Sequence, residues 1–74
     1  MEKTDFRLSL RAARVNAGMS QEKAAEMCGV TRFTIKNWEH GITRPTNLQL
    51  LGLSQLYNIP LEYIFLPEKI SERE

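Results

Sequence analysis

The chain has 74 residues, of which 42% are hydrophobic and 26% are charged, a composition typical of one small globular domain. It has no run of 18 apolar residues and no apolar N-terminal segment, so we expect no membrane span, no secretion signal and a cytoplasmic location. A single histidine, a single cysteine and the lack of a paired-carboxylate motif offer too few groups for a catalytic centre or a His/Cys metal site. We therefore expect neither enzymatic activity nor a cofactor.

Charge is distributed unevenly along the chain, although the formal net charge is only +1. Residues 1–45 carry eight basic and five acidic residues, a balance of +3, whereas residues 46–74 carry two basic and four acidic residues, a balance of −2. A basic front half is suited to contact with a polyanion such as nucleic acid. A chance scatter of exposed charge explains the same pattern equally well.

Helix signals alternate with helix breakers along the chain, and no stretch alternates β-branched with polar residues. We therefore expect an all-α domain without strands. The first helix is predicted from Phe6 to Ala17, with Thr4 or Asp5 as its N-cap and Gly18 at its end.

Two further helices are predicted between Ser20 and Gly41, joined by a very short turn. Ser20 is a favourable N-cap for the second helix, and Glu22 places negative charge in its first turn. Gly29 can adopt the positive φ that the turn requires. Thr31 can cap the third helix, which Gly41 ends.

The last two helices are predicted from turn and cap residues. Thr46 and Gln49 form a capping box at the start of the fourth helix, and Asn58 can end that helix in the left-handed conformation. Pro60 opens a short fifth helix that runs through Phe65. We therefore expect a compact five-helix domain over residues 1–66 and a charged, frayed tail over residues 67–74.

The fourth helix carries more apolar side chains than one core-facing stripe needs. The stripe itself is predicted at Leu50, Leu53 and Tyr57, whereas Leu48, Leu51 and Leu56 lie partly off it. Surplus apolar surface on a small protein often marks an interface, so we expect a homodimer that forms through this helix. The alternative is that the fifth helix covers the surplus with Leu61, Ile64 and Phe65.

The stretch from Gln21 to Gly41 places two short helices in sequence with only three residues between them, so the helices must cross steeply. Small or apolar residues stand 4, 8, 14 and 17 positions after Gln21, at Ala25, Gly29, Ile35 and Trp38. This spacing resembles the DNA-binding helix-turn-helix of the phage Cro and repressor family, also called the XRE family. The segments LRAARVNAGMSQEKAA, TIKNWEHGITRP and NLQLLGLSQLYNIPLEYIF resemble the family as well, and the likeness covers residues 8–66.

Two core positions depart from the family pattern. Ala13 and Ala24 stand where larger aliphatic residues are usual, and we expect Trp38 to fill the missing volume. Met27 is expected to be a core or half-buried residue, and Cys28 a small core residue.

The resemblance implies a lambda-repressor-like fold that binds double-stranded DNA in the major groove through its third helix. Ile35 and Trp38 are expected to face the core, so the outward-facing residues of that helix are the candidates for base contact. They are Arg32, Phe33, Lys36 and Asn37.

Each candidate offers chemistry that suits a base. Arg32 can make paired hydrogen bonds to guanine, and Asn37 can do so to adenine. Lys36 can reach a base or a phosphate, and Phe33 can contact a thymine methyl group. The alternative for Arg32 and Lys36 is an exposed face without a ligand, and for Phe33 it is packing against a neighbouring side chain.

Phosphate contacts would fix the register of the domain on DNA. The resemblance assigns one to Gln21, whose side chain and neighbouring backbone amides can hold a phosphate oxygen. The next candidates flank the groove face and are Thr31, His40, Thr43 and Arg44. His40 is explained equally well as an exposed residue near a helix C-terminus.

The resemblance implies a structural role for Arg14 and Glu39, as a partly buried ion pair that joins the first and third helices. For the whole chain it implies a transcriptional regulator, and we expect a repressor that occupies a near-palindromic operator as a homodimer. The alternative is the antitoxin of a toxin–antitoxin pair that also regulates its own promoter. A protein partner would then be a toxin or, for a repressor, an anti-repressor.

Overall fold

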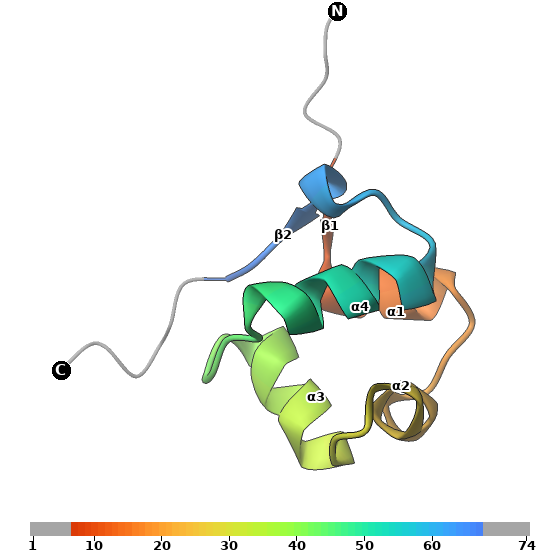
Figure 1. Cartoon of the computed structure of the whole chain (residues 1–74), viewed down its shortest axis with the longest axis vertical. Helices are drawn as coiled ribbons and strands as arrows, with labels where there is room; N and C mark the ends of the chain where they lie inside the picture. Colours follow the sequence, from red (N-terminus) through yellow and green to blue (C-terminus); the bar gives the residue numbers. More distant parts are fainter. Residues whose placement is uncertain (1–6, 68–74) are drawn as a thin grey trace, which may run out of the picture.

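The computed structural model describes residues 7–67 as four α-helices with a short two-stranded sheet (Figure 1). In chain order the elements are β1 (Leu8–Ser9), α1 (Leu10–Asn16), α2 (Gln21–Cys28), α3 (Arg32–His40), α4 (Asn47–Tyr57), the 3-10 helix η1 (Leu61–Tyr63) and β2 (Ile64–Phe65). In Figure 1, α1 and α4 lie between the strand pair and the pair formed by α2 and α3. No helix within residues 7–67 is both long and apolar enough to cross a membrane.

The three N-caps expected after residue 18 are confirmed. The Ser20 hydroxyl accepts the Lys23 amide at 3.0 Å and begins α2, and the Thr31 hydroxyl accepts the Thr34 amide at 3.2 Å and begins α3. The capping box at α4 is complete. Its members are Thr46, whose hydroxyl accepts the Gln49 amide at 3.1 Å, and Gln49, whose side chain accepts the Thr46 amide at 2.8 Å.

The ends of α2, α3 and α4 also lie where the sequence predicts them, with Gly41 ending α3. Gly29 ends α2 with φ +73°, a left-handed conformation that costs glycine little and most other residues more. Asn58 ends α4 with φ +60°, and it is the only residue other than glycine with positive φ among those described. The short turn that joins α2 to α3 therefore depends on Gly29.

The predicted start of the first helix is wrong. Its N-cap is Ser9, whose hydroxyl accepts the Ala12 amide at 3.1 Å, so α1 begins at Leu10 rather than at Phe6. The two residues before the helix, Leu8 and Ser9, form β1 instead. Thr4, Asp5 and Phe6 lie outside the described residues.

The predicted fifth helix and the absence of strands are wrong as well. Pro60 precedes a single 3-10 turn, and the chain then extends into β2, so the fold has four α-helices within residues 7–67. The strand pair is parallel, with Leu8 opposite Ile64 and Ser9 opposite Phe65. This pairing joins residues that are far apart in the sequence and ties the entry of α1 to the end of the fold. The tail from residue 68 onward lies outside the described residues.

The core lies where the four helices and β2 meet. Its buried members are Leu10, Ala13, Ala24, Ala25, Ile35, Trp38, Leu53, Tyr57 and Ile64. Ala13 and Ala24 are fully buried in the same cluster as Trp38, which is 4% exposed. This arrangement agrees with Trp38 occupying volume that larger residues would otherwise take.

The outer surface of α4 is not covered by the C-terminal elements. Leu53 and Tyr57 are buried and Leu50 is half-buried, as expected for the core stripe. Leu48 is 78% exposed and Leu51 is 42% exposed, so the alternative in which residues 61–65 cover the surplus is wrong. Met27 was expected to be at least half-buried, but 57% of its surface is exposed beside α4.

Candidate DNA-binding surface

Helix α3 presents two faces, as its sequence pattern predicts. Ile35 and Trp38 are 1% and 4% exposed and pack into the core. The opposite face carries Arg32, Phe33 and Lys36, all of which are exposed, whereas Asn37 is half-buried. Because the Thr31 cap fixes the first turn, Arg32 and Phe33 occupy the N-terminal end of the helix, the part that enters a DNA groove most deeply in helix-turn-helix domains.

Phe33 packs against a neighbour in the free protein. The Lys36 ammonium lies 5.4 Å from the centre of the Phe33 ring, within the range of a cation–π contact. Phe33 is nevertheless 65% exposed, so one face of the ring is available to a ligand. The pair places a positive charge and an apolar surface side by side on the outer face of α3.

A hollow of about 440 Å³ opens beside this face, at the N-terminus of α2. It is lined by Arg11, Arg14, Ser20, Gln21, Glu22 and Arg32. Arg14 is already paired with Glu39, but Arg11 and Arg32 outnumber Glu22, so the hollow keeps a surplus of positive charge. The free backbone amides of a helix N-terminus add further donors for an anion. The hollow therefore suits a phosphate group.

Arg11 was not among the residues predicted from the sequence. It is exposed and lines the hollow together with Gln21 and Arg32, which come from α2 and α3. The sequence feature that could have pointed to Arg11 is its position one turn before Arg14 on the same helix. That spacing alone does not reveal which other elements the side chain meets.

The ionic contact between α1 and α3 is largely shielded from solvent. Arg14 donates from Nε to Oε2 of Glu39 at 2.6 Å and from Nη2 to Oε1 at 3.3 Å. The side chains are 9% and 3% exposed, and Arg14 Nη1 also donates to the Met19 carbonyl at 2.8 Å. The pair therefore connects α1, the turn before α2, and the end of α3.

Gln21 joins the same network. Its Nε2 donates to Oε1 of Glu39 at 3.0 Å, which holds the side chain at the first position of α2. One N–H and the amide oxygen of Gln21 are not used by this bond. Glu39 thus orients a residue that lines the cationic hollow.

The remaining phosphate candidates lie beyond the core. Thr31, His40, Thr43 and Arg44 are exposed at the two ends of α3 and in the loop that follows it. The Thr31 hydroxyl already serves as the N-cap, and the Arg44 Nη1 donates to the Pro67 carbonyl at 3.2 Å. Arg44 therefore lies against the last described residue of the chain.

Tyr57, which is buried, and Cys28, which is half-buried, both have a raised pKa. Burial, with a smaller contribution from the negative charge of Glu39, raises the pKa of Tyr57 to about 12, although the Arg14 charge acts in the opposite direction. Burial also raises the pKa of the Cys28 thiol. Within residues 7–67 no group of three His, Cys, Asp or Glu side chains is placed to hold a metal ion.

The helix-turn-helix family profile matches residues 10–64, which span all four helices. The chain belongs to this family, in its XRE branch. It is 33% identical over 64 residues to the HTH-type transcriptional regulator ImmR of Bacillus subtilis (strain 168), covering 86% of this chain and 50% of that protein. It is 38% identical over 56 residues to HTH-type transcriptional regulators of Sinorhizobium medicae and Rhizobium meliloti, covering 76% of this chain and 40% of each.

The chain thus spans half or less of the length of these curated relatives. No solved structure matches it significantly.

Proposed function

We propose that the protein is a sequence-specific DNA-binding transcriptional regulator that acts as a repressor. The proposal rests on one feature of the structure: the outer face of α3 adjoins the cationic hollow at the start of α2. Arg32 belongs to both, so a base-reading surface and a phosphate-holding surface adjoin. The likeness to proteins named as HTH-type transcriptional regulators supports a role as a DNA-binding regulator.

In this proposal the exposed residues of α3 enter the major groove. Arg32 reads guanine, Asn37 reads adenine, Phe33 contacts a thymine methyl group, and Lys36 reaches a base or a phosphate. Asn37 is half-buried whereas the other three residues are exposed, so we expect it to contact DNA at the edge of this surface.

The phosphate contacts surround that reading surface. Gln21 holds a phosphate with the N-terminal amides of α2, and Arg11 adds positive charge from α1. The further contacts come from Thr31, His40, Thr43 and Arg44.

We propose that two copies bind together, so that two α3 helices read half-sites about 34 Å apart in a near-palindromic operator. Occupancy of the operator would exclude polymerase. In the antitoxin alternative, the arm that binds the toxin would be the tail Glu68–Glu74, which lies outside the described residues.

A salt titration tests the proposed phosphate contacts. Binding to duplex DNA, measured by fluorescence anisotropy, should weaken steeply between about 50 and 200 mM salt because counterions are released. Arg44→Ala should weaken binding to all sequences about equally and flatten the slope. Lys23→Ala is a matched control, because Lys23 is an exposed cation in α2 outside the hollow. A salt response that is flat for the parent would contradict the proposal.

A further inference from the structure

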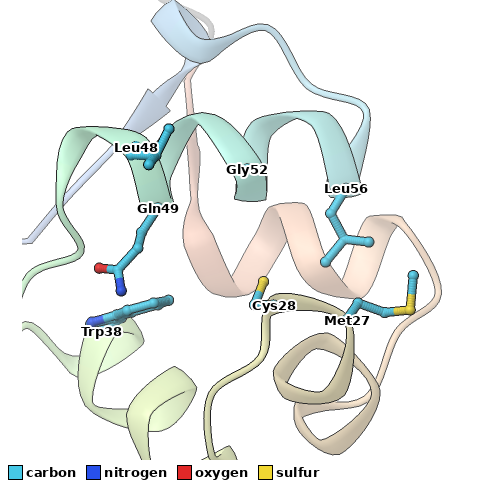
Figure 2. Close-up of a pocket in the computed structure, with 7 residues that line it drawn as sticks. All are labelled: Met27, Cys28, Trp38, Leu48, Gln49, Gly52 and Leu56. Atoms are coloured by element: carbon cyan, nitrogen blue, oxygen red, sulfur yellow. The ribbon is translucent and has the colours of Figure 1, made fainter.

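An apolar groove of about 310 Å³ lies between α4 and the facing ends of α2 and α3 (Figure 2). Met27 and Cys28 line it from the last turn of α2, and Trp38 lines it from α3. The α4 side includes Leu48, Gly52 and Leu56, spaced one helical turn apart. Gln49 also lines the groove, and its side-chain amide lies next to Trp38 (Figure 2), so the groove is mostly apolar, with two leucines that flank a glycine.

Gly52 has no explanation within one copy of the chain. Glycine in the interior of a helix is destabilising compared with almost any other residue. A Cβ atom placed at Gly52 would meet no atom of the protein within 4 Å, so no internal contact requires a glycine there. A glycine on an exposed helix face does allow another chain to approach the backbone closely.

The groove is also free of charge. None of its lining residues is charged, and α4 contains no Asp, Glu, Lys or Arg, although 26% of the whole chain is charged. A two-fold contact brings one surface against a copy of itself, so any charge on it would lie near a like charge. The centres of protein interfaces are depleted of charged residues. A neutral apolar surface of this kind suits a second copy of the same chain.

We propose that this groove is the contact surface of the homodimer, in which Leu48 of one copy occupies the groove over Gly52 of the other. Leu48 is 78% exposed at the rim, so its side chain is available to a partner. The contact is reciprocal, because a two-fold axis places each Leu48 in the partner's groove. The inference deepens the proposed function by naming the surface through which two copies pair.

The groove and the DNA-binding surface lie at opposite ends of α2. Gln21 is the first residue of that helix, whereas Met27 and Cys28 are its last two. At a rise of about 1.5 Å per residue, these ends are separated by about 10 Å along the helix axis. The groove and the N-terminal hollow also share no lining residue, so contact through the groove does not use the residues proposed to hold a phosphate.

Sedimentation equilibrium of the full chain tests the contact. Gly52→Glu puts like charges at the contact, and Leu48→Ser removes the inserted side chain, so each should raise the dimer dissociation constant about 30-fold or more. Gly52→Glu should not lower the melting temperature at concentrations where the parent is monomeric, because glutamate favours a helix more than glycine does. Val15→Glu is the matched control, since Val15 is 55% exposed on α1 and lines a different hollow.

A mixture of Gly52→Glu and Gly52→Lys proteins tests whether the partner in the groove is a second copy of the same chain. Opposite charges should restore association in the mixture, while each variant alone remains monomeric. The proposal is overturned if the parent stays monomeric, if Gly52→Glu and Leu48→Ser dimerise like the parent, or if Val15→Glu alone dissociates the dimer. Duplex DNA binding is measured separately with the same proteins. A parent that dimerises through the groove but binds no DNA would refute the proposed function and leave this inference standing.

Discussion

Arg14 and Glu39 are joined by two hydrogen bonds, at 2.6 and 3.3 Å, across the interface between α1 and the end of α3. The same carboxylate accepts the Gln21 amide at 3.0 Å. Glu39 therefore links the packing of three helices to the orientation of a residue at the proposed phosphate site. The ion pair stabilises the fold only while both partners are present, because each would otherwise be a charge shielded from water.

Glu39→Gln and Arg14→Met should each lower the free energy of unfolding by about 3–5 kcal/mol, because each leaves the other partner buried and uncompensated. The double variant Arg14→Met/Glu39→Leu should lose less than the sum of the single changes. Urea denaturation measures all of these values. Lys23→Ala is a control, since the Lys23–Glu26 pair at 3.9 Å is exposed and should contribute about 0–1 kcal/mol. If the loss of stability in the double variant equals the sum of the two single losses, Arg14 and Glu39 are not energetically coupled.

Trp38→Ala should lower the free energy of unfolding by about 3–5 kcal/mol, because it leaves a cavity beside the fully buried Ala13 and Ala24. Phe33→Ala serves as the control, because that ring is 65% exposed and its removal leaves no core cavity. Thermal or urea denaturation distinguishes the two variants. If Trp38→Ala unfolds like the parent, Trp38 does not fill the core.

The sequence predicts the helix boundaries from residue 20 to residue 58 because each depends on neighbouring residues. Ser20, Thr31 and the Thr46–Gln49 box cap backbone amides three positions away, and Gly29 and Asn58 provide local left-handed turns. These are short-range effects, which a linear pattern records directly.

The errors fall where the structure depends on distant contacts. Leu8 and Ser9 are extended because they pair with Ile64 and Phe65, and no local pattern reveals that partner. The same pairing explains why the chain after Pro60 forms only one 3-10 turn before it extends. Residues 64–65 cannot be both helical and paired with β1.

The outward face of α3 could be predicted from periodicity, since Ile35 and Trp38 mark the inward face. The residues that surround that face could not be predicted from the sequence pattern. Arg11 reaches the hollow only because α1 packs against α3 and the fold brings the N-terminus of α2 to the same hollow. The Arg44–Pro67 contact joins residues 23 positions apart.

The raised pKa of Tyr57 predicts that the free energy of unfolding falls at high pH. Its pKa is about 12 in the folded protein against an ordinary value of 10.0, so the folded state holds the proton more tightly than the unfolded state does. The resulting stabilisation is fully present below about pH 10 and is lost as the pH rises towards about 12, on the order of 2 kcal/mol in total. Urea denaturation at a series of pH values measures it. The pKa of the half-buried Cys28 thiol is also raised, so its ionisation at high pH lowers the stability of the protein in the same direction. The comparison should therefore be made in a Cys28→Ala background.

Tyr57→Phe in that background should remove most of the decline between about pH 10 and pH 12. Tyr63→Phe is the control, because Tyr63 is 41% exposed whereas Tyr57 is 2% exposed. An unchanged decline in Tyr57→Phe would show that Tyr57 is not responsible.

Phe33 should discriminate thymine from uracil, which lacks the methyl group. Replacing the contacted thymine by deoxyuridine should weaken binding by the parent but not by Phe33→Ala, because only the parent has an apolar surface at that position. Competition binding with matched duplexes measures the difference. Equal effects in both proteins would favour the alternative in which Phe33 only packs against Lys36.

We propose that α3 reads base sequence through Arg32 and Asn37. Selection of bound sites from a random duplex library is the direct test. The parent should select a near-palindrome with half-sites about 34 Å apart. Arg32→Ala should lose preference at one symmetric pair of guanines, and Asn37→Ala at one symmetric pair of adenines, each by about 1–3 kcal/mol. An asymmetric single site, or unchanged preferences in both variants, would contradict the claim.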